Sequence, residues 1–502
     1  MKRRTFLRST LAAGAAAAVP ASRPLEAFYR EASSFPADVL AVTGDGREVT
    51  LTDAAIADLT ARVDGRVLLA GDDGYDSARR VLNPSFDKRP ALIVQVTGTA
   101  DVRTAVDFAR ENEGLLTAVK CGGHSASGKS TCDRGMMIDL SPFRDVRVDP
   151  IDRTARVTGG SLLGQLDHES MAYDLVTPMG TVSHTGVGGL VTGGGFGRVA
   201  RRFGLSIDNL LSVDVVTADG AFRRASADEN PDLFWGVRGG GGNFGIVTSF
   251  EFRLHEMPRR VLGGYLFFPI DRARDVLTLF GEYGPEAPDE LQLDLVVAQP
   301  PGNAPGVAGF SICYSGAPGQ ADRALAPVRA LGTPAVDTVQ GMDYVALQRS
   351  GDIDDPRARA AYLKSGFFTA MSPRLVDIIV DGFEGAPDRT TQIIIQQSGG
   401  AIGRVASDAT AFSQRQARGN LLASVDWASG SDPDEHIEWC RAYWSTIEPF
   451  TDGFYMNDGA PDETMARIRA SYRENYERLV RVKNRYDPTN LFRLNSNVVP
   501  TV

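Results

Sequence analysis

Three glycine-rich stretches constrain this 502-residue chain more than any other feature of its sequence. They cover residues 121–130 (CGGHSASGKS), 186–197 (GVGGLVTGGGFG) and 239–245 (GGGGNFG), and each lies beside a predicted strand or helix start. Glycine has no Cβ, so successive backbone N–H groups can converge on an anion such as a pyrophosphate. Three such loops favour one large nucleotide cofactor, which an acidic protein can bind in this way without lysines.

Two familiar nucleotide-binding motifs do not account for these loops. The stretch GHSASGKS at 123–130 has the G-x-x-x-x-G-K-S spacing of a Walker loop, since Gly123 lies five residues before Gly128, but we treat this single match as a coincidence. The stretch GGGFG opens a short helix, yet no acidic residue about twenty positions later clearly takes the ribose role of a nicotinamide-binding fold. We therefore assign the three loops to neither motif.

Apolar periodicity predicts a mixture of helices and strands. Residues 92–96 are typical of a strand, 100–113 of a helix and 115–120 of a second strand, so a β-α-β unit ends in the first glycine loop. Beyond about residue 256 the glycine loops thin out and a separate α/β domain is expected. Further strands are expected in GMMIDLS, ARVTGG, VTSFEFRLH, LQLDLVVAQ and TQIIIQQS, a hairpin in SVDVVTADGAFRRAS and a helix in QADRALAPVRAL.

The last part of the sequence predicts one charged amphipathic helix, starting near DETMARIRASY and stopped by Asp487-Pro488. We expect this terminal segment to return to the first domain.

The amino terminus has the pattern of a twin-arginine export signal. Arg3 and Arg4 precede Phe6 and an alanine-rich apolar run that ends at Val19. This run is shorter than the roughly 20 residues that cross a bilayer, so we expect an exported protein, secreted or periplasmic, with no membrane insertion. The alternative is an arginine-rich internal helix, but the alanine run lacks helical polar spacing.

Net charge indicates the kind of binding partner, and cysteine content bears on disulfide bonds. The 53 basic and 63 acidic residues give a net charge of -10, which disfavours a nucleic-acid footprint and favours a small-molecule partner. Cys121, Cys132, Cys313 and Cys440 are too few for a disulfide scaffold. Cys121 and Cys132 are the nearest pair in sequence, and whether they form a disulfide stays open.

His124, inside the first glycine loop, allows three interpretations. A metal ligand would need companions, and His184 with the two nearby cysteines shows no tight zinc spacing. A plain loop histidine would need none. A nucleophile in an anion site could attack an electrophilic carbon of the cofactor itself, which is how a flavin becomes tethered. Spacing alone leaves these interpretations open.

Five stretches resemble, in order and spacing, the berberine bridge enzyme-like FAD-linked oxidases of the vanillyl-alcohol oxidase superfamily. They are VKCGGHSASG, CDRGMMIDLS, GTVSHTGVGGLVTGGGFGRVARRFGLSIDNLLSVDVVTADG, NPDLFWGVRGGGGNFGIVTSFEF and NYERLVRVKNRYDPTNLFRLNSNV. The resemblance runs from about Tyr75 to the end and is looser in the middle, at YLKSGFF and SGGAIGRVASDATAF.

The resemblance implies an α+β fold with a two-part FAD-binding domain of the PCMH type. After a signal peptide and linker at 1–35, this domain would take residues 36–256 and a carboxy-terminal return at 446–502. The inserted domain at 257–445, an α/β unit built on an antiparallel sheet, would bind the substrate.

The resemblance also implies how the cofactor is held. His124 would carry FAD covalently through the flavin 8α carbon. Val182 replaces the cysteine that gives many relatives a second bond, so we expect a single link. Thr185 falls at the position that controls oxygen access, where many oxidases have valine. The other expected cofactor contacts are Cys121, Gly122, Gly123, Ser125, Gly188, Gly189, Asn243, Gly245, Val247 and Asn495.

Tyr455, in GFYMNDG, matches the tyrosine that the family places at the flavin. We expect positive or hydrogen-bonding surroundings to lower its pKa, so that the phenolate takes the alcohol proton of the substrate. Ser398 stands where some relatives have a second tyrosine, which favours a single base. His184 is expected to face the substrate or to support its loop, and Lys364 is a candidate anion contact, although a surface lysine is the ordinary expectation.

These features predict an exported FAD oxidase that converts a sugar or natural-product alcohol to a carbonyl and reduces O2 to hydrogen peroxide. Three alternatives stay open. A dehydrogenase with a non-oxygen acceptor is favoured by Thr185, and an oxidative cyclase is a further possibility within the family. A flavin-carrying binding protein without turnover is favoured by the missing second tyrosine.

Overall fold

The computed structural model describes residues 38–502 apart from 300–303, 356 and 387–389. The expected signal peptide and linker at 1–35 lie outside the described residues. Residues Asp38–Val502 form one compact unit. The domain boundaries at 256 and 445 stay a prediction.

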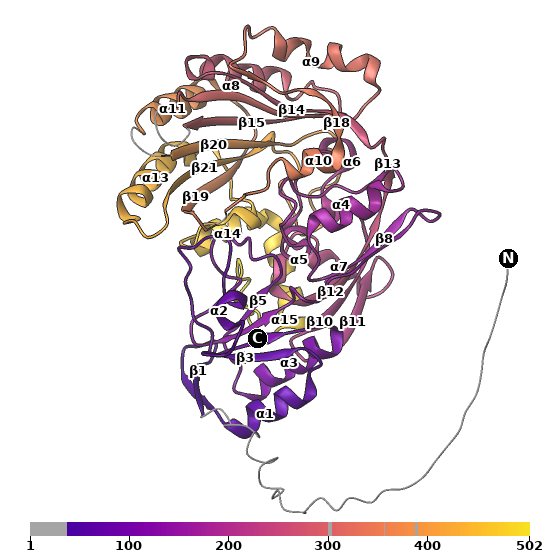
Figure 1. The fold of residues 1–502 in the computed structure, drawn as a ribbon, viewed down its shortest axis with the longest axis vertical. Coiled ribbons are helices and arrows are strands. Elements are labelled where there is room, and N and C mark those ends of the chain that lie inside the picture. The colour runs from indigo at the N-terminus through magenta and orange to yellow at the C-terminus, as the bar shows by residue number, and fades with distance from the viewer. Residues whose placement is uncertain (1–37, 300–303, 356, 387–389) are drawn as a thin grey trace, which may run out of the picture. The chain divides into compact units, whose positions relative to one another are not determined.

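A four-stranded sheet in the order β3-β4-β6-β5 forms the base of the lower half of Figure 1. The predicted β-α-β unit is confirmed as β4, α3 and β5, but β6 lies between its two strands and pairs with both in parallel. The buried face of α3 carries Val102, Ala105, Val106 and Ala109, as the helical spacing predicts. The strands are β3 (Arg66–Leu69), β4 (Leu92–Gln95), β5 (Thr117–Lys120) and β6 (Met136–Asp139), covered by α1 (Asp53–Arg62) and α3 (Thr99–Glu111).

A five-stranded antiparallel sheet follows in the order β11-β10-β12-β8-β7. The predicted hairpin is confirmed, and Gly220 at its turn has a φ of +76°, which favours glycine. Strand β7 (Val146–Asp149) is not predicted from the sequence. The other strands are β8 (Thr154–Thr158), β10 (Leu210–Thr217), β11 (Phe222–Ser226) and β12 (Gly245–Arg253), and the helices between them are α4 (Leu163–Met171), α5 (Val187–Gly193), α6 (Ala200–Phe203) and α7 (Pro231–Val237).

An eight-stranded antiparallel sheet occupies the upper half of Figure 1. Its long strands are β14 (Arg260–Pro269), β15 (Leu291–Gln299), β16 (Val307–Tyr314), β19 (Arg359–Phe368), β20 (Thr390–Gln397) and β21 (Gly419–Ala428), and its helices are α8 (Ala273–Tyr283), α9 (Ala321–Arg329), α11 (Pro373–Glu384) and α13 (Asp434–Ile447). Ile393 and Ile395 of β20 pack into the core shared with these helices. Because side chains alternate along a strand, Gln396 points to the opposite face of the sheet, where it lines a cavity.

The carboxy-terminal segment forms two helices, so the expectation of a single terminal helix is wrong. Helix α14 (Met465–Tyr472) ends where Arg473 adopts a positive φ of 49°, and α15 (Tyr476–Tyr486) follows. The second helix stops before Asp487-Pro488 as predicted. It packs against α7, so the yellow end of the chain lies among the magenta elements of the lower half (Figure 1).

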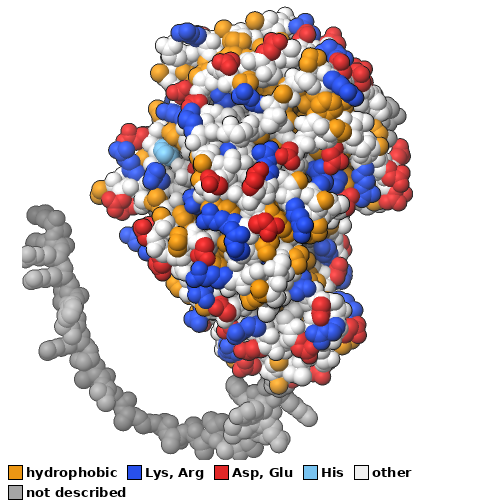
Figure 2. Space-filling model, turned by 180° about the vertical axis from the view of Figure 1, so that it is seen from behind, with side chains coloured by type: hydrophobic (Ala, Val, Ile, Leu, Met, Phe, Trp, Pro, Cys, Tyr) orange, Lys and Arg blue, Asp and Glu red, His pale blue; other side chains and the backbone are white. Residues whose placement is uncertain are grey.

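None of the helices in the described part of the chain combines the length and the continuous apolar sequence that a membrane span requires. On the face seen in Figure 2, basic and acidic side chains are interspersed.

Candidate active site

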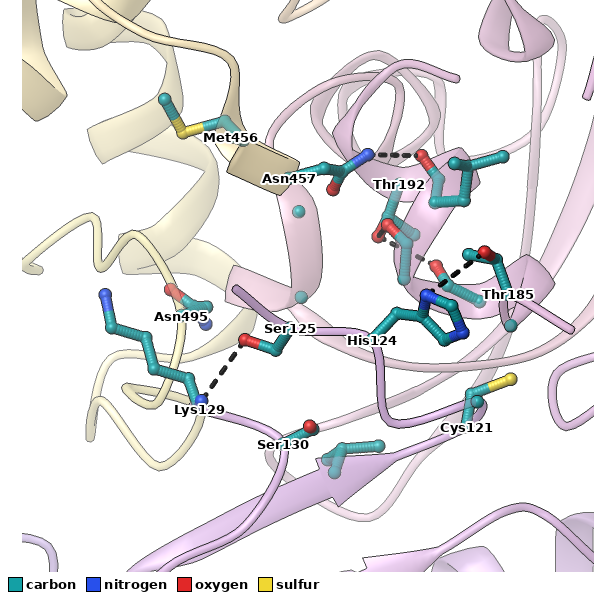
Figure 3. A pocket seen from close by; sticks show the side chains of 18 of the residues that line it. Cys121, His124, Ser125, Lys129, Ser130, Thr185, Thr192, Met456, Asn457 and Asn495 are labelled. Carbon is teal, nitrogen blue, oxygen red and sulfur yellow. Dashed lines mark hydrogen bonds between the residues drawn. The ribbon is translucent and has the colours of Figure 1, made fainter. Parts of the chain in front are cut away.

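A cavity of about 400 Å³ lies where the three glycine-rich loops meet the carboxy-terminal segment (Figure 3). This volume falls within the range of small-molecule and cofactor sites. Of the described residues that were predicted for the site, Asn243 and His184 alone do not line it. Those that line it are Cys121, Gly122, Gly123, His124, Ser125, Val182, Thr185, Gly188, Gly189, Gly245, Val247, Tyr455 and Asn495.

The glycines serve two different purposes around this cavity. A Cβ on Gly122 would lie 2.4 Å from the backbone nitrogen of Gly186, and a Cβ on Gly186 would lie 2.4 Å from Cys121 Sγ. These glycines let the first two loops pack backbone against backbone. Gly189 and Gly241 instead face open space, with no atom of the described residues within 4 Å of an added Cβ. Their backbone is accessible to a ligand in the cavity.

Two buried polar atoms at the cavity wall support a bound ligand. Ser130 Oγ and Asn495 Oδ1 have no hydrogen-bond partner among the described residues, and both residues line the cavity. Buried polar groups without a partner are destabilising, so native structures usually satisfy them with protein, water or ligand. Open glycine backbone together with these two oxygens fits a polar, anionic cofactor such as FAD.

Asn243 and Asn495 come from different loops that meet at this wall. Asn243 is buried, its Nδ2 donates to the carbonyl oxygens of Gly240 and Ser496, and its Oδ1 accepts from the N–H of Val498. Asn243 therefore ties the third glycine loop to the carboxy-terminal segment from behind the cavity.

His124 and His184 form a hydrogen-bonded pair. His124 Nε2 lies 2.7 Å from His184 Nδ1, and the backbone N–H of Ile353 donates to His184 Nε2 at 3.2 Å. Since His184 Nε2 accepts, the proton of a neutral His184 sits on Nδ1 and is donated to His124 Nε2. His124 Nδ1 is then the nitrogen that carries the proton, 3.3 Å from Thr185 Oγ1 (Figure 3).

The imidazole of His124 is uncharged at neutral pH. Burial, reinforced by the neighbouring His184, lowers the pKa of His124 to about 4. A neutral imidazole retains a lone pair and can act as a nucleophile, whereas a protonated one cannot. Among the described residues, no group of three or more His, Cys, Asp or Glu side chains is placed to hold a metal ion.

Tyr455 lines the cavity, but its environment is opposite to the one expected. Burial raises the pKa of Tyr455 well above its usual range, and the neighbouring Asp458 raises it further. Its oxygen accepts hydrogen bonds from the N–H of Gly195 and from Asn457 Nδ2, both at 2.7 Å. These two donors lower the pKa less than burial raises it, so the expected lowering is wrong.

Asp458 and Lys129 belong to the cavity wall and are missed by the sequence analysis. Asp458 lies three residues after Tyr455 in the GFYMNDG stretch, and burial raises the pKa of its carboxyl to about 7. Lys129 belongs to the SGKS stretch that resembles a Walker loop, and its side chain extends towards Met456 in Figure 3. Their nearness in sequence to Tyr455 and His124 is the signal that could have indicated them.

Two other expectations are settled by the described residues. Lys364 is not a surface lysine, because it is buried and forms ion pairs with Asp462 and Glu463 at 2.9 and 3.1 Å. Cys121 and Cys132 are free thiols, with no disulfide in the described part of the chain.

Comparison with known proteins agrees with this site. A family model for an FAD binding domain matches residues 90–226, and a model for berberine and berberine like proteins matches residues 454–499. The two matches contain the first two glycine loops and the segment of Tyr455.

Individual relatives match over nearly their whole length. An FAD-linked oxidoreductase of Dictyostelium discoideum is 31% identical over 87% of this chain and 95% of its own. The (R)-6-hydroxynicotine oxidase of Paenarthrobacter nicotinovorans is 30% identical over 87% of this chain and 97% of its own. The solved structure of a xylooligosaccharide oxidase from Myceliophthora thermophila, in complex with xylobiose, has a TM-score of 0.80 at 27% identity, covering 89% of this chain and 100% of that one.

These comparisons confirm the expected α+β fold of PCMH-type FAD oxidases. Residues from both matched segments line the cavity. The chain belongs to the berberine bridge enzyme-like family of FAD-linked oxidoreductases.

Proposed function

We propose that this protein oxidises a hydroxyl group of a small molecule, such as a sugar or a natural-product alcohol, to a carbonyl, with O2 as the electron acceptor and hydrogen peroxide as the second product. When bound, FAD supplies the acceptor for a hydride and its two electrons, which then pass to O2. The names of two relatives, a hydroxynicotine oxidase and a xylooligosaccharide oxidase, support oxidation of small organic substrates.

The single observation that carries the proposal is a neutral His124 at the wall of a glycine-lined cavity. We propose that His124 is bonded to the 8α carbon of the flavin, because its imidazole keeps a lone pair at neutral pH. Val182, also at the wall, is apolar and offers no thiol for a second bond. Ser130 Oγ and Asn495 Oδ1, which have no partner among the described residues, would form hydrogen bonds with the cofactor.

The substrate end of the cavity is proposed to lie beside Tyr455 and Gln396. Gln396 comes from the eight-stranded sheet, and Phe196 adds an apolar edge that packs against the ring of Tyr455 at 5.2 Å between centroids. A site with an apolar wall and a few polar groups suits an uncharged hydroxyl compound. The O–H of Tyr455 can donate a hydrogen bond to the oxygen of the substrate.

The covalent link is tested by precipitating the purified protein with acid. We expect the yellow colour to stay with the protein, and mass spectrometry to find the flavin on the peptide that contains His124. The variant His124→Ala should release all of its colour. Complete release from the wild-type protein would contradict the link.

The oxidase assignment is tested by measuring peroxide per substrate consumed, with the expected ratio near one. A dehydrogenase is the second candidate, because the hydroxyl of Thr185 stands at the cavity wall where the resemblance expects control of oxygen access. Substrate turnover with a dye acceptor and without peroxide would favour the dehydrogenase.

We further propose that the protein is exported through the twin-arginine pathway. Replacing Arg3 and Arg4 with lysine should retain it inside the cell.

A further inference from the structure

Asp458 is a half-buried carboxyl group that the proposed function does not use. It follows Tyr455 in a short turn, is half-buried and lines the cavity. Its Oδ2 accepts a hydrogen bond from Asn420 Nδ2 at 2.7 Å. No other side-chain hydrogen bond to this carboxyl is found among the described residues, so Oδ1 keeps its lone pairs for a group in the cavity.

Three other polar residues that line the cavity, Tyr455, His124 and Lys129, are less suited to act as the base. The oxygen of Tyr455 already accepts two N–H groups, so the hydrogen-bonding function that it can still offer is its hydrogen. His124 is the residue proposed to bond the flavin, and that bond uses the lone pair of its imidazole. The ammonium group of Lys129 donates and does not accept.

We propose that Asp458 Oδ1 is the general base that removes the hydroxyl proton of the substrate, an inference that rests on the proposed oxidation of an alcohol. The O–H bond breaks and its proton goes to the Asp458 carboxylate. The adjacent C–H bond breaks with both electrons, which leave as a hydride for the FAD acceptor, and the C=O double bond forms. Tyr455 donates its O–H hydrogen bond to the same oxygen and orients it.

The surroundings of Asp458 suit a base that works near neutral pH. Burial raises its pKa to about 7, and the hydrogen bond from Asn420 opposes this rise. A base is most effective when its pKa lies near the working pH, because it is then both ionised and a good proton acceptor.

Ionisable groups from each neighbouring segment complete this environment. Tyr455 precedes Asp458 on the same turn, Lys129 approaches from the first glycine loop, and Lys364 of β19 is held in its ion pairs with Asp462 and Glu463. Strands β20 and β21 contribute the uncharged Gln396 and Asn420. Burial therefore outweighs the influence of any of these charges on the pKa of Asp458.

Asp167 provides a matched control. It is a buried carboxyl whose pKa is likewise raised by burial to about 7, and it also accepts from a side-chain amide, Gln348 Nε2 at 3.2 Å. Asp167 does not line the cavity formed by the described residues. The variants Asp458→Asn and Asp167→Asn thus make the same chemical change at two sites, and the amide oxygen introduced by Asp458→Asn can still accept the hydrogen bond from Asn420.

The first measurement is anaerobic bleaching of the holoenzyme flavin by xylobiose, glucose and benzyl alcohol across pH 5 to 9. In the wild type we expect the rate to rise with pH through about 7. Asp458→Asn should lower the rate about 10²- to 10⁴-fold and abolish the rise, Asp458→Glu should restore part of both, and Asp167→Asn should keep both. A rise that persists in Asp458→Asn, or that disappears in Tyr455→Phe, would overturn the proposal.

The second measurement is infrared titration of the protonated carboxyl bands of the same proteins, which does not depend on turnover. We expect two bands that disappear near pH 7, one lost in each asparagine variant. Absence of an Asp458 band that titrates in this range would refute the base even if the variant were slow. If none of the three alcohols bleaches the wild-type flavin, the proposed alcohol oxidation itself fails, an outcome distinct from an active wild type with an unaffected Asp458→Asn.

Discussion

The proton on the imidazole of His124 is placed by a residue that does not touch the cavity. His184 accepts from the backbone N–H of Ile353 and therefore presents its own N–H to His124. In His184→Ala, His124 loses this donor, so both of its neutral forms become populated and its ring is less firmly held.

If the flavin is bonded to His124 as proposed, we expect His184→Ala to slow its covalent attachment severalfold. The measurement is the fraction of flavin that stays with the acid-precipitated protein at successive times after FAD is added to flavin-depleted cells. His255→Ala is the matched control, because His255 also forms a side-chain hydrogen bond, with Asn209, but lies outside the cavity wall. Equal rates of attachment in the two variants would contradict this role of His184.

Asp167 should make the folded state less stable as the pH rises. Its pKa is raised from 3.8 in the unfolded chain to about 7 in the fold, so the protonated carboxyl stabilises the fold. This contribution is fully present below about pH 4 and is lost as the pH rises through about 7, with a magnitude of up to about 4 kcal/mol.

Urea unfolding at pH 5 and pH 8 tests this expectation. The difference in unfolding free energy between the two pH values should shrink in Asp167→Asn and stay as in the wild type in Asp58→Asn, which changes an exposed carboxylate. An unchanged difference in Asp167→Asn would show that Asp167 is ionised in the fold at both pH values.

At the scale of elements, two glycines of the second loop should respond differently to alanine. In Gly186→Ala the new Cβ would meet Cys121 Sγ and the backbone of Gly122 at 2.4 Å, so we expect a lower melting temperature and little bound flavin. Gly189 lies within α5 and faces the cavity, so Gly189→Ala should keep or raise the melting temperature by favouring the helix, while lowering the flavin-to-protein ratio. Equal losses of stability in the two variants would contradict this division.

Sequence periodicity predicts the individual helices and strands of this fold better than it predicts which of them lie side by side. The repeat of Val102, Ala105 and Val106 is a local property, and it correctly predicts the buried face of α3. The insertion of β6 between β4 and β5 depends on pairing between distant segments, which no local pattern carries. Likewise, nothing in the residue type of Arg473 indicates the positive φ that divides the terminal helix.

The same distinction holds for the candidate site. The glycine loops and the cofactor are indicated by residue type and by resemblance, because backbone access to an anion requires those residues. The ionisation of Tyr455 and Asp458 could not be predicted, because their pKa values are set by burial among strands and loops that lie far away in the sequence.

At the scale of the whole molecule, the buried ion pair of Lys483 and Asp487 connects the carboxy-terminal segment to the third glycine loop. Lys483 Nζ donates to Asp487, to the carbonyl oxygen of Phe492 and to that of Asn243, and both charged side chains are fully buried. Removing one partner of such a pair leaves the other charge buried without compensation.

We expect Lys483→Ala to lower the unfolding free energy by about 3–5 kcal/mol and to lower the flavin-to-protein ratio. Arg485→Ala on the same helix breaks an exposed pair with Asp232 and should change stability by less than about 1 kcal/mol. Chemical unfolding and the flavin absorbance of the purified variants measure both effects. A loss in Arg485→Ala as large as in Lys483→Ala would contradict the importance of burial.

The cavity wall joins residues 121–125 to residues 494–496, segments separated by about three quarters of the chain. During synthesis, before residues 494–496 have been translated, the cavity therefore lacks the part of its wall that these residues form. Loading must wait until residues 494–496 have left the exit tunnel, and a nonsense codon just upstream of them should yield a colourless product.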